Sequence, residues 1–214
     1  MLVYERMSRH PLTVRPDARV DATLKRMREE KVRRFPVVDE HGKLVGIVSD
    51  KDLLYAAPSP ATSLSIYELH YLYSRITVEQ VMTREVITVD ENAPLEEAAR
   101  IMVDNKVGGL PVTRDGQLVG IITETDIFKT FMEMMGARDQ GVRLTLLCRN
   151  QKGELAALTG AIAELGGNII SLGTFWGEDA STAIITLKVA DVDKDTLVEK
   201  ITPLILEVID VRDI

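Results

Sequence analysis

The 214-residue sequence predicts an α/β protein of the α+β type, with two similar half-domains followed by a small ferredoxin-like domain. The first observation is an internal repeat, because the segments around Met7 and Pro36 recur around Met82 and Pro111 with the same spacing. The second is a βαββαβ pattern downstream of residue 142. Two copies this regular are expected to face each other across a pseudo-twofold axis, so a site in the crevice between them would be built twice.

Each copy predicts the order strand, helix, strand, strand, helix (βαββα). In the first copy, Asp17 is expected to cap a helix that carries Val20, Leu24 and Met27 on its apolar face, and Asn92 is its counterpart in the second. A first strand precedes each helix, and two short apolar strands joined by a turn follow it. The predicted strand pair of the first copy is 35–38 and 44–48, and the second copy repeats it around Asp115-Gly116.

The segment between the copies begins with a turn-rich stretch and continues as a helix over 64–73. Its residues Tyr67, Tyr71 and Tyr73 are able to stack on a base or to pack as core or interface. The predicted organisation is repeat 1 at 1–57, a connector with this helix at 58–76, repeat 2 at 77–135, a hinge at 136–141 and a third domain at 142–214.

The third domain alternates apolar and polar residues over 142–148, which predicts a strand. A loop leads into a helix that Gly166-Gly167 end as a C-cap. The apolar face of this helix is expected to comprise Leu155, Leu158, Ile162 and Leu165. The remaining elements are expected at 168–172 and 181–189 (strands), 194–202 (helix) and 207–211 (strand).

The composition is that of an ordinary globular protein, with 45% hydrophobic and 28% charged residues. No apolar run is long enough for a membrane span and no secretion signal is apparent, so a cytoplasmic protein is expected. The single cysteine, Cys148, excludes an intrachain disulfide, and the three histidines are not spaced as metal ligands. No metal site is therefore expected.

Charge is distributed unevenly along the chain. Residues 1–34 carry ten Lys and Arg against five acids, although the whole chain has a net charge of −7. This balance suits a small anionic ligand better than nucleic acid, which the acidic remainder would repel. For Lys25, Arg26 and Arg28, the alternative is a solvated helix face.

Two motifs have residues suited to ligand binding. The first is Gly46-x-x-Ser49-x-x-Asp52, and the second is Gly120-x-x-Thr123-x-x-Asp126. Glycine lets the backbone approach a ligand, a hydroxyl can bind a phosphate, and the carboxylate can accept both hydroxyls of a ribose. The same spacing also fits a capping box, in which the acid satisfies the N–H group of the cap residue. Both interpretations stay open at this point.

With the Met-Ser/Thr starts, the Thr-Val strands and the Pro-Val strands, these motifs resemble a tandem pair of cystathionine-β-synthase (CBS) domains, the Bateman module, over residues 1–135. The resemblance implies an adenosine ligand, AMP, ATP, S-adenosylmethionine or NAD, with the aspartates on ribose, the hydroxyls on phosphate and the Thr-Val backbone at the base. The implied contact residues are Thr13, Val14, Arg33, Arg34, Phe35, Pro36, Ser49, Lys51 and Asp52, and Thr88, Val89, Gly108, Gly109, Leu110, Pro111, Thr123, Thr125 and Asp126.

The two copies differ just before the proline of the Pro-Val strand. Arg33-Arg34 of the first copy correspond to Gly108-Gly109 of the second. Arginine offers forked donors to phosphate, whereas glycine offers space and backbone. We expect two unequal sites, one better suited to a phosphate chain; the alternative is that the arginines are solvated and the glycines form a bulge.

The third domain resembles an ACT domain over residues 142–212, through Asn-x-x-Gly-x-Leu and Gly-Gly-Asn-Ile. The resemblance implies an amino-acid effector near Asn150 and Asn168, but Cys148 stands where some serine-binding members place a histidine. Structurally, Asn150 can close a turn and Asn168 can tolerate a left-handed backbone. The candidate effector residues are Asn150, Gly153, Leu155, Asn168 and Ile169.

The whole chain resembles the acetoin-utilisation protein B family, which implies an accessory or regulatory role. The sequence contains no nucleophile-base pair and no Gly-x-Gly-x-x-Gly loop after a strand, so an enzyme is not expected. A non-catalytic sensor of adenine nucleotides is predicted, as a homodimer with a regulated enzyme as a possible partner and without nucleic-acid or membrane binding. The alternative is a structural dimerisation or partner-binding platform with no nucleotide ligand.

Overall fold

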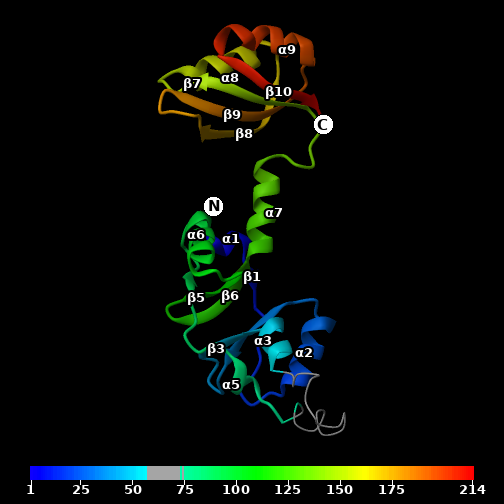
Figure 1. Ribbon diagram of the computed structural model, residues 1–214, viewed down its shortest axis with the longest axis vertical. Helices are drawn as coiled ribbons and strands as arrows, with labels where there is room; N and C mark the ends of the chain where they lie inside the picture. The colour runs from blue at the N-terminus through cyan, green and yellow to red at the C-terminus, as the bar shows by residue number, and fades with distance from the viewer. Residues whose placement is uncertain (57–72, 74) are drawn as a thin grey trace. The chain divides into compact units, whose positions relative to one another are not determined.

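The computed structural model describes residues 1–56, 73 and 75–214, and divides into two compact units, Met1–Ile127 and Phe128–Ile214 (Figure 1). The connector helix expected at 64–73 lies outside the described residues, except for Tyr73. The Tyr73 hydroxyl donates to the carbonyl oxygen of Leu53 at 3.2 Å, and its side chain packs against the core of the first repeat. The predicted α/β class, with two βαββα repeats and a ferredoxin-like domain, is confirmed.

The second repeat has a four-stranded sheet in the order β1-β6-β5-β4. Strand β4 is parallel to β5, and the other pairs are antiparallel. The turn between β5 and β6 has Asp115 and Gly116 in the left-handed region, as the sequence indicates. The elements are α1 (Val3–Arg6), β1 (Ser8–Arg9), β4 (Val89–Asp90), α6 (Leu95–Asn105), β5 (Gly109–Arg114), β6 (Gln117–Thr123) and α7 (Glu124–Met134).

The first repeat has the same arrangement with shorter pairings. Strands β2 and β3 form an antiparallel ladder, Val14 pairs in parallel with Val37, and Thr83 pairs with Ile47. The elements are α2 (Val20–Glu29), β2 (Arg34–Val38), β3 (Leu44–Ser49), α3 (Asp50–Tyr55) and α5 (Val78–Val81).

The segment that begins each repeat is exchanged onto the other repeat. Strand β1, near the N-terminus, pairs with β6 of the second repeat, and Thr83 pairs with β3 of the first. Val3 of α1 is fully buried in the core of the second repeat, and Val78 of α5 in that of the first. Each half of the unit is therefore completed by main chain from the other.

This exchange also explains why the predicted helix caps are wrong. Helix α2 begins after Arg19, not Asp17, and α6 begins after Pro94, not Asn92. The first amide of α2, at Val20, donates to the carbonyl oxygen of Ile76 at 3.0 Å, and the Leu95 amide of α6 donates to that of Met1 at 3.1 Å. A backbone carbonyl of the exchanged segment therefore accepts from the first amide of each helix, in place of a side-chain cap.

The glycine of each repeated motif makes room for the exchanged methionine. A Cβ atom on Gly46 would meet the Met82 side chain and lie 3.1 Å from the Thr83 carbonyl oxygen. A Cβ atom on Gly120 would meet the Met7 side chain and the Ser8 carbonyl oxygen in the same way. The close approach that these glycines permit is therefore between chain segments, and not only toward a ligand.

The third domain is a sheet in the order β10-β7-β9-β8 with all pairs antiparallel, and α8 and α9 cover one face (Figure 1). Gly166 follows α8 with a φ of 76°, and Gly167 N donates to the Ile162 carbonyl oxygen, which confirms the expected C-cap. The predicted apolar face of α8 is wrong at Leu155, which is 42% exposed. The elements are β7 (Val142–Arg149), α8 (Glu154–Glu164), β8 (Asn168–Trp176), β9 (Thr182–Ala190), α9 (Lys194–Ile201), the 3₁₀ turn η1 (Thr202–Leu204) and β10 (Glu207–Asp213).

The residues after α7 are fixed to the uncovered face of this sheet by a buried lysine. Lys188 of β9 is 3% exposed, and its Nζ donates to the carbonyl oxygens of Gly136 at 2.7 Å and Asp139 at 2.9 Å. The Ser171 hydroxyl donates to the carbonyl oxygen of Met135 at 3.2 Å. The predicted hinge thus begins with residues that are hydrogen-bonded to the sheet.

We predict that Gly46→Ala lowers the free energy of unfolding of the first unit by about 1–3 kcal/mol, because the new methyl group overlaps the exchanged Met82 segment. Urea denaturation followed by far-UV circular dichroism measures this change. Gly160→Ala is the control: Gly160 lies in α8 with open space around it, so alanine should stabilise that helix by about 0.5–1 kcal/mol. Equal effects of the two variants would contradict the exchange contact.

Candidate functional site

Both repeated motifs form hydrogen-bonded turns at the start of a helix. In the first, the Ser49 backbone N–H and hydroxyl donate to Asp52 Oδ2 at 2.8 and 2.7 Å. In the second, the Thr123 N–H and hydroxyl donate to Asp126 Oδ2 at 2.9 and 2.7 Å. The capping interpretation therefore describes the local structure of both motifs.

Capping does not use up the acceptor capacity of these aspartates. A carboxylate has two oxygens and about four acceptor positions, and both capping bonds of Asp52 go to Oδ2. The side chain of Asp52 is half-buried at the edge of a cavity. The residue is thus held in one orientation by the cap while its carboxylate can still accept ligand hydroxyls.

A cavity of about 560 Å³ lies between the two repeats. It joins the first motif to the loop before β5 and to the segment that follows the exchanged Met82. The lining residues are Arg33, Arg34, Ile47, Ser49, Asp50, Lys51, Asp52, Thr83, Glu85, Val86, Ile87, Lys106, Val107, Gly108, Gly109 and Glu124.

Arg34 crosses this cavity from the first repeat to the second. Its guanidinium donates to the Gly108 carbonyl oxygen, and a Cβ atom at either Gly108 or Gly109 would lie 2.7 Å from a guanidinium nitrogen. Burial lowers the pKa of Arg34, and the nearby Glu124 carboxylate opposes that shift. The two arginines and two glycines that distinguish the repeats in sequence therefore face each other in space.

The cavity contains charges of both signs. Four basic side chains, Arg33, Arg34, Lys51 and Lys106, line it together with four acidic ones, Asp50, Asp52, Glu85 and Glu124. Such a lining suits a ligand that has an anionic group and several hydroxyls, because both types of side chain then find partners.

Several predicted contact residues lie elsewhere. The side chains of Phe35, Pro36, Leu110 and Pro111 are buried, and Thr123, Thr125 and Asp126 do not line this cavity. Val14 and Val89 are buried in the cores of their repeats, while Thr13 and Thr88 are half-buried without lining the cavity.

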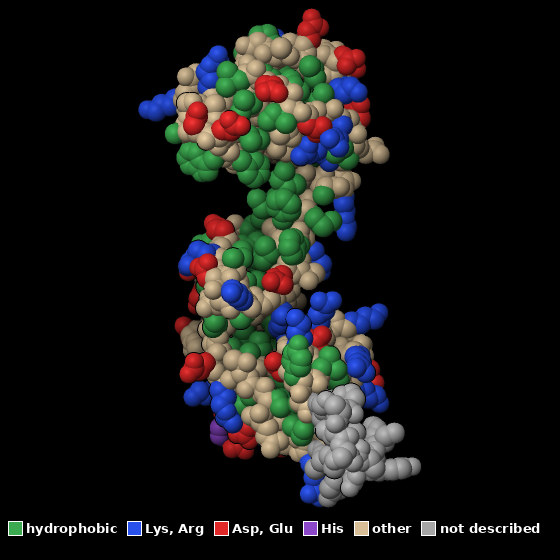
Figure 2. All heavy atoms as spheres, viewed as in Figure 1, with side chains coloured by type: hydrophobic (Ala, Val, Ile, Leu, Met, Phe, Trp, Pro, Cys, Tyr) green, Lys and Arg blue, Asp and Glu red, His purple; other side chains and the backbone are tan. Residues whose placement is uncertain are grey.

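Arg26, one of the basic residues of the N-terminal segment, makes contacts within the first repeat. Arg26 of α2 donates to the Thr13 carbonyl oxygen at 2.8 Å and lies 5.0 Å from the centre of the Phe35 ring. Figure 2 shows other Lys and Arg side chains gathered on the surface over α2. This supports the solvated-face interpretation for part of the basic segment.

Sequence reasoning missed the contribution of the exchanged segment and of Lys106. Thr83, Val86 and Ile87 line the cavity because Thr83 pairs with Ile47 of the first repeat. Lys106 is the C-cap residue that follows α6, and its backbone is left-handed (φ 55°). Lys31, its counterpart in the repeat alignment, has the same conformation. The sequence gives little indication of it, because lysine is uncommon in the left-handed region.

The two asparagines of the third domain lie at opposite ends of its sheet. Asn150 Nδ2 donates to the Ala180 carbonyl oxygen at 3.0 Å, so it closes the turn beside the Trp176 end of β8. Asn168 begins β8, roughly 26 Å from that end at about 3.3 Å per residue. The backbone of Asn168 is not left-handed. One small effector cannot touch both asparagines within a single copy of the chain.

The other candidate effector residues, Gly153, Leu155 and Ile169, lie near the starts of α8 and β8. Gly153 caps α8 with a φ of 95°, Leu155 is exposed, and Ile169 packs against the core. Cys148 is buried, and burial raises the pKa of its thiol. Among the residues that the structure describes, no cluster of three metal-ligating side chains is present. Within the same described ranges, no helix has the length and apolar character needed to cross a membrane.

Comparison with protein-family models identifies both parts of the chain. The CBS domain model matches residues 3–59 and 78–133, more than half of the chain, and the AHAS small subunit-like ACT domain matches residues 144–213.

Two curated relatives show the range of proteins that share the CBS pair. A CBS domain-containing protein of Dictyostelium discoideum is 32% identical over 142 residues, 63% of this chain and 94% of that protein. An inosine-5′-monophosphate dehydrogenase of Aquifex aeolicus is 33% identical over 171 residues, 78% of this chain but 32% of the enzyme. The similarity to the enzyme is thus confined to a minor part of its length.

Three solved structures match between 61% and 65% of this chain. An AcuB protein of Vibrio cholerae, provisionally assigned to acetoin utilization, has a TM-score of 0.54 at 32% identity, covering 64% of this chain and 95% of that one. The CBS domain pair of protein MJ0100, in complex with 5′-methylthioadenosine and S-adenosyl-L-methionine, has a TM-score of 0.52 at 31% identity, with coverages of 65% and 98%. CBSX2 of Arabidopsis thaliana, in complex with AMP, has a TM-score of 0.51 at 33% identity, with coverages of 61% and 96%.

We predict that Asp52→Ala and Asp126→Ala each lower the free energy of unfolding by about 1 kcal/mol, because each removes the acceptor of a capping box. The Asp→Asn variants should retain most of this energy, since the amide oxygen still accepts from the backbone N–H. Urea denaturation of the four variants measures the difference. If the Asn variants lost as much stability as the Ala variants, the charge and not the capping bond would be the stabilising term.

Proposed function

This chain belongs to the CBS-domain family and carries a C-terminal ACT domain, and on that premise we propose that it is a non-catalytic regulatory protein that binds a phosphate-bearing adenosine ligand between its CBS repeats. The observation that carries the proposal is the cavity in which Ser49, Lys51 and Asp52 of one repeat face Lys106 and Gly108 of the other. AMP and ATP are the preferred candidates.

Each group of the ligand has a matching group in the cavity. The Asp52 carboxylate, oriented by its cap, would accept the ribose hydroxyls. The basic side chains Arg33, Lys51 and Lys106 would hold the phosphate. Apolar side chains of the exchanged segment, Val86 and Ile87, offer a surface for the adenine ring. A phosphate would pair with the basic groups, whereas the sulfonium cation of S-adenosylmethionine would have to pair with the acidic side chains of the same cavity.

The comparisons support an adenosine ligand without identifying it. CBSX2 was solved with AMP, and the MJ0100 pair with 5′-methylthioadenosine and S-adenosyl-L-methionine. A role in acetoin utilisation, as for the Vibrio cholerae protein, is one pathway that such a regulator would serve.

The unequal repeats favour one strong site in each chain. Arg34 and Gly108 join the two repeats across the cavity, so a phosphate that attracts Arg34 would compete with the Gly108 carbonyl oxygen. Binding would then shift the balance between two positions of the arginine, which is the differential interaction that a sensor requires. The ligand-dependent state would be read by a regulated partner enzyme or by a second copy of the chain.

The ACT domain is proposed to receive a second effector only in a dimer. Because Asn150 and Asn168 lie at opposite ends of β8, a site that uses both must take one from each of two copies. Sedimentation of the chain with and without amino acids tests this part separately.

We predict that AMP binds the purified, nucleotide-free chain with a stoichiometry of one, and that Asp52→Asn weakens binding about ten- to a hundredfold by removing the carboxylate acceptor of the ribose hydroxyls. Isothermal titration with AMP, and then with ATP, S-adenosylmethionine and NAD, measures affinity and stoichiometry. Asp126→Asn is the matched control, because it makes the same change in the equivalent cap but Asp126 does not line the cavity.

Equal affinities in the two Asn variants would contradict the assignment of the cavity. Absence of binding by all four nucleotides would favour the alternative function, a dimerisation or partner-binding platform built on the CBS pair.

A further inference from the structure

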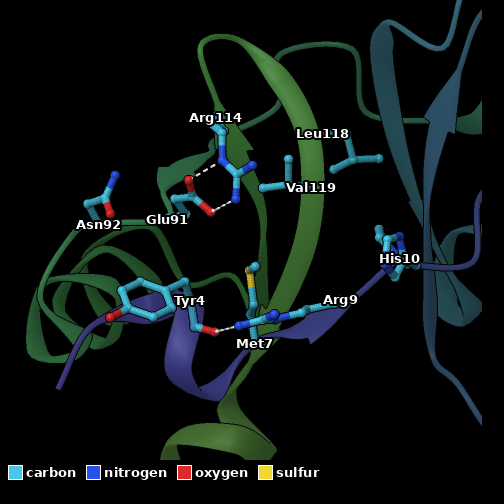
Figure 3. Close-up of a pocket in the computed structure, with 10 residues that line it drawn as sticks. Tyr4, Met7, Arg9, His10, Glu91, Asn92, Arg114, Leu118 and Val119 are labelled. Carbon is cyan, nitrogen blue, oxygen red and sulfur yellow. Dashed lines mark hydrogen bonds and ion pairs between the residues drawn. The ribbon is translucent and has the colours of Figure 1, made fainter.

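A second cavity lies on the second repeat, outside the site described above. It has a volume of about 590 Å³ and is bounded by α1, β1 and the β5–β6 hairpin (Figure 3). None of its lining residues belongs to the nucleotide cavity. Figure 3 shows Glu91 and Arg114 on one side with Val119 next to Arg114, Tyr4 and Arg9 on the opposite side, and Met7 between them.

The acidic group of this pocket is already neutralised. Glu91 is 7% exposed, and its carboxylate accepts two bonds from Arg114, through Nε and, at 2.7 Å, through Nη2. These hydrogen bonds hold the pKa of Glu91 below its ordinary value. The Arg114 side chain itself remains 61% exposed and lines the pocket. The pair fixes Arg114 in place without consuming all five of its donors.

Arg9 supplies a second positive charge near Glu91, and it differs from its counterpart in the first repeat in that it forms no direct ion pair with any described residue. Its counterpart in the alignment of the repeats is Arg84, which forms an ion pair with Glu79 at 3.1 Å. The counterpart of Glu79 is Tyr4. Among the described residues, Arg9 has no carboxylate within ion-pair distance, and its Nη2 only approaches the Tyr4 carbonyl oxygen at 3.5 Å.

The same comparison shows that three acidic positions of the first repeat are replaced around the pocket, although Glu91 itself stands at the position of Pro16. The position of Glu85 in one repeat is occupied by His10 in the other, and the position of Asp39 by Arg114. Three acidic positions, including that of Glu79, thus become aromatic or basic ones on this face. Arg114 pairs with the buried Glu91, whereas Tyr4 and His10 replace carboxylates without providing a new partner for Arg9.

The floor and one wall of the pocket are apolar. Met7 lies against Gly120 and presents its thioether between the two arginines, and Val119, which like Met7 packs against the core of the repeat, adds apolar surface beside Arg114. The half-buried Tyr4 ring adds an aromatic face. Charged donors at two sides of an apolar floor are the features of a site for an amphipathic anion.

We propose that this pocket binds a small organic carboxylate with an aromatic or branched apolar body. The carboxylate accepts hydrogen bonds from Arg9 and from the remaining donors of Arg114, and the body lies on Met7 and Val119 beside the Tyr4 ring. The site is independent of the nucleotide cavity and does not rest on the proposed function.

The experiment is isothermal titration of the full chain with phenylacetate, for which a Kd on the order of 1 mM or tighter is expected from a ligand of this size. Phenylacetamide, which has the same shape without the charge, should bind at least about tenfold more weakly. Inorganic phosphate distinguishes a general anion site, because it has the charge but no apolar body.

Tyr4→Glu is the decisive variant, since it restores the arrangement of Glu79 and Arg84 and supplies Arg9 with a carboxylate. It should weaken phenylacetate binding about ten- to a hundredfold, as should Arg9→Gln. Arg84→Gln, the same change in the other repeat, is the control and should leave binding unchanged. Both pocket variants keep the Glu91–Arg114 pair, so they avoid leaving a buried carboxylate without a partner.

No phenylacetate binding by the wild-type chain would overturn the proposal, as would wild-type affinity in Tyr4→Glu and Arg9→Gln. Phosphate binding as tight as that of phenylacetate would reject the apolar component. AMP titration of the same variants separates this result from the nucleotide proposal, because Tyr4 and Arg9 lie outside that cavity.

Discussion

The mutual exchange of the segments that begin the two CBS repeats is the constraint on which the first unit depends. Main-chain bonds join β1 to β6 and Thr83 to Ile47, and carbonyl oxygens of the exchanged segments satisfy the first amides of α2 and α6. Unpaired buried backbone groups would each cost about 1–3 kcal/mol, so neither repeat has a complete structure without the other. Both repeated motifs require glycine at their first position, because the side chain of the exchanged methionine occupies the space that a Cβ atom would need.

The cavity between the repeats follows from this exchange. Thr83 pairs with the strand that leads to Ser49, which brings Val86 and Ile87 beside the capped Asp52. The two repeats share one backbone arrangement but differ in side chains at this cavity. Arg34 of the first repeat reaches Gly108 and Gly109 of the second, where a side chain would collide with it. The same arrangement positions Arg9 and Tyr4 on the opposite repeat, on a surface where the two copies have diverged in charge.

Much of this organisation was predictable from the sequence, and the remainder was not for physical reasons. The apolar periodicity of Val20, Leu24 and Met27 and the glycines after α8 depend on local geometry, which the sequence records. The exchange is not local. Because the repeats are alike, the segments that begin them have the same apolar pattern, and this pattern does not show which repeat each segment completes. The local pattern therefore predicts Asp17 and Asn92 as caps, although in the structure a distant carbonyl oxygen accepts from the first amide of each helix.

Covalent linkage of the repeats has a consequence for how such an exchange is maintained. Two separate chains that each contained one repeat would complete each other only by association, and their folding would depend on concentration. In the present chain the partner segment is tethered, and a short tether sets an effective concentration in the millimolar range. The tandem arrangement thus makes a reciprocal strand exchange independent of how much protein the cell contains.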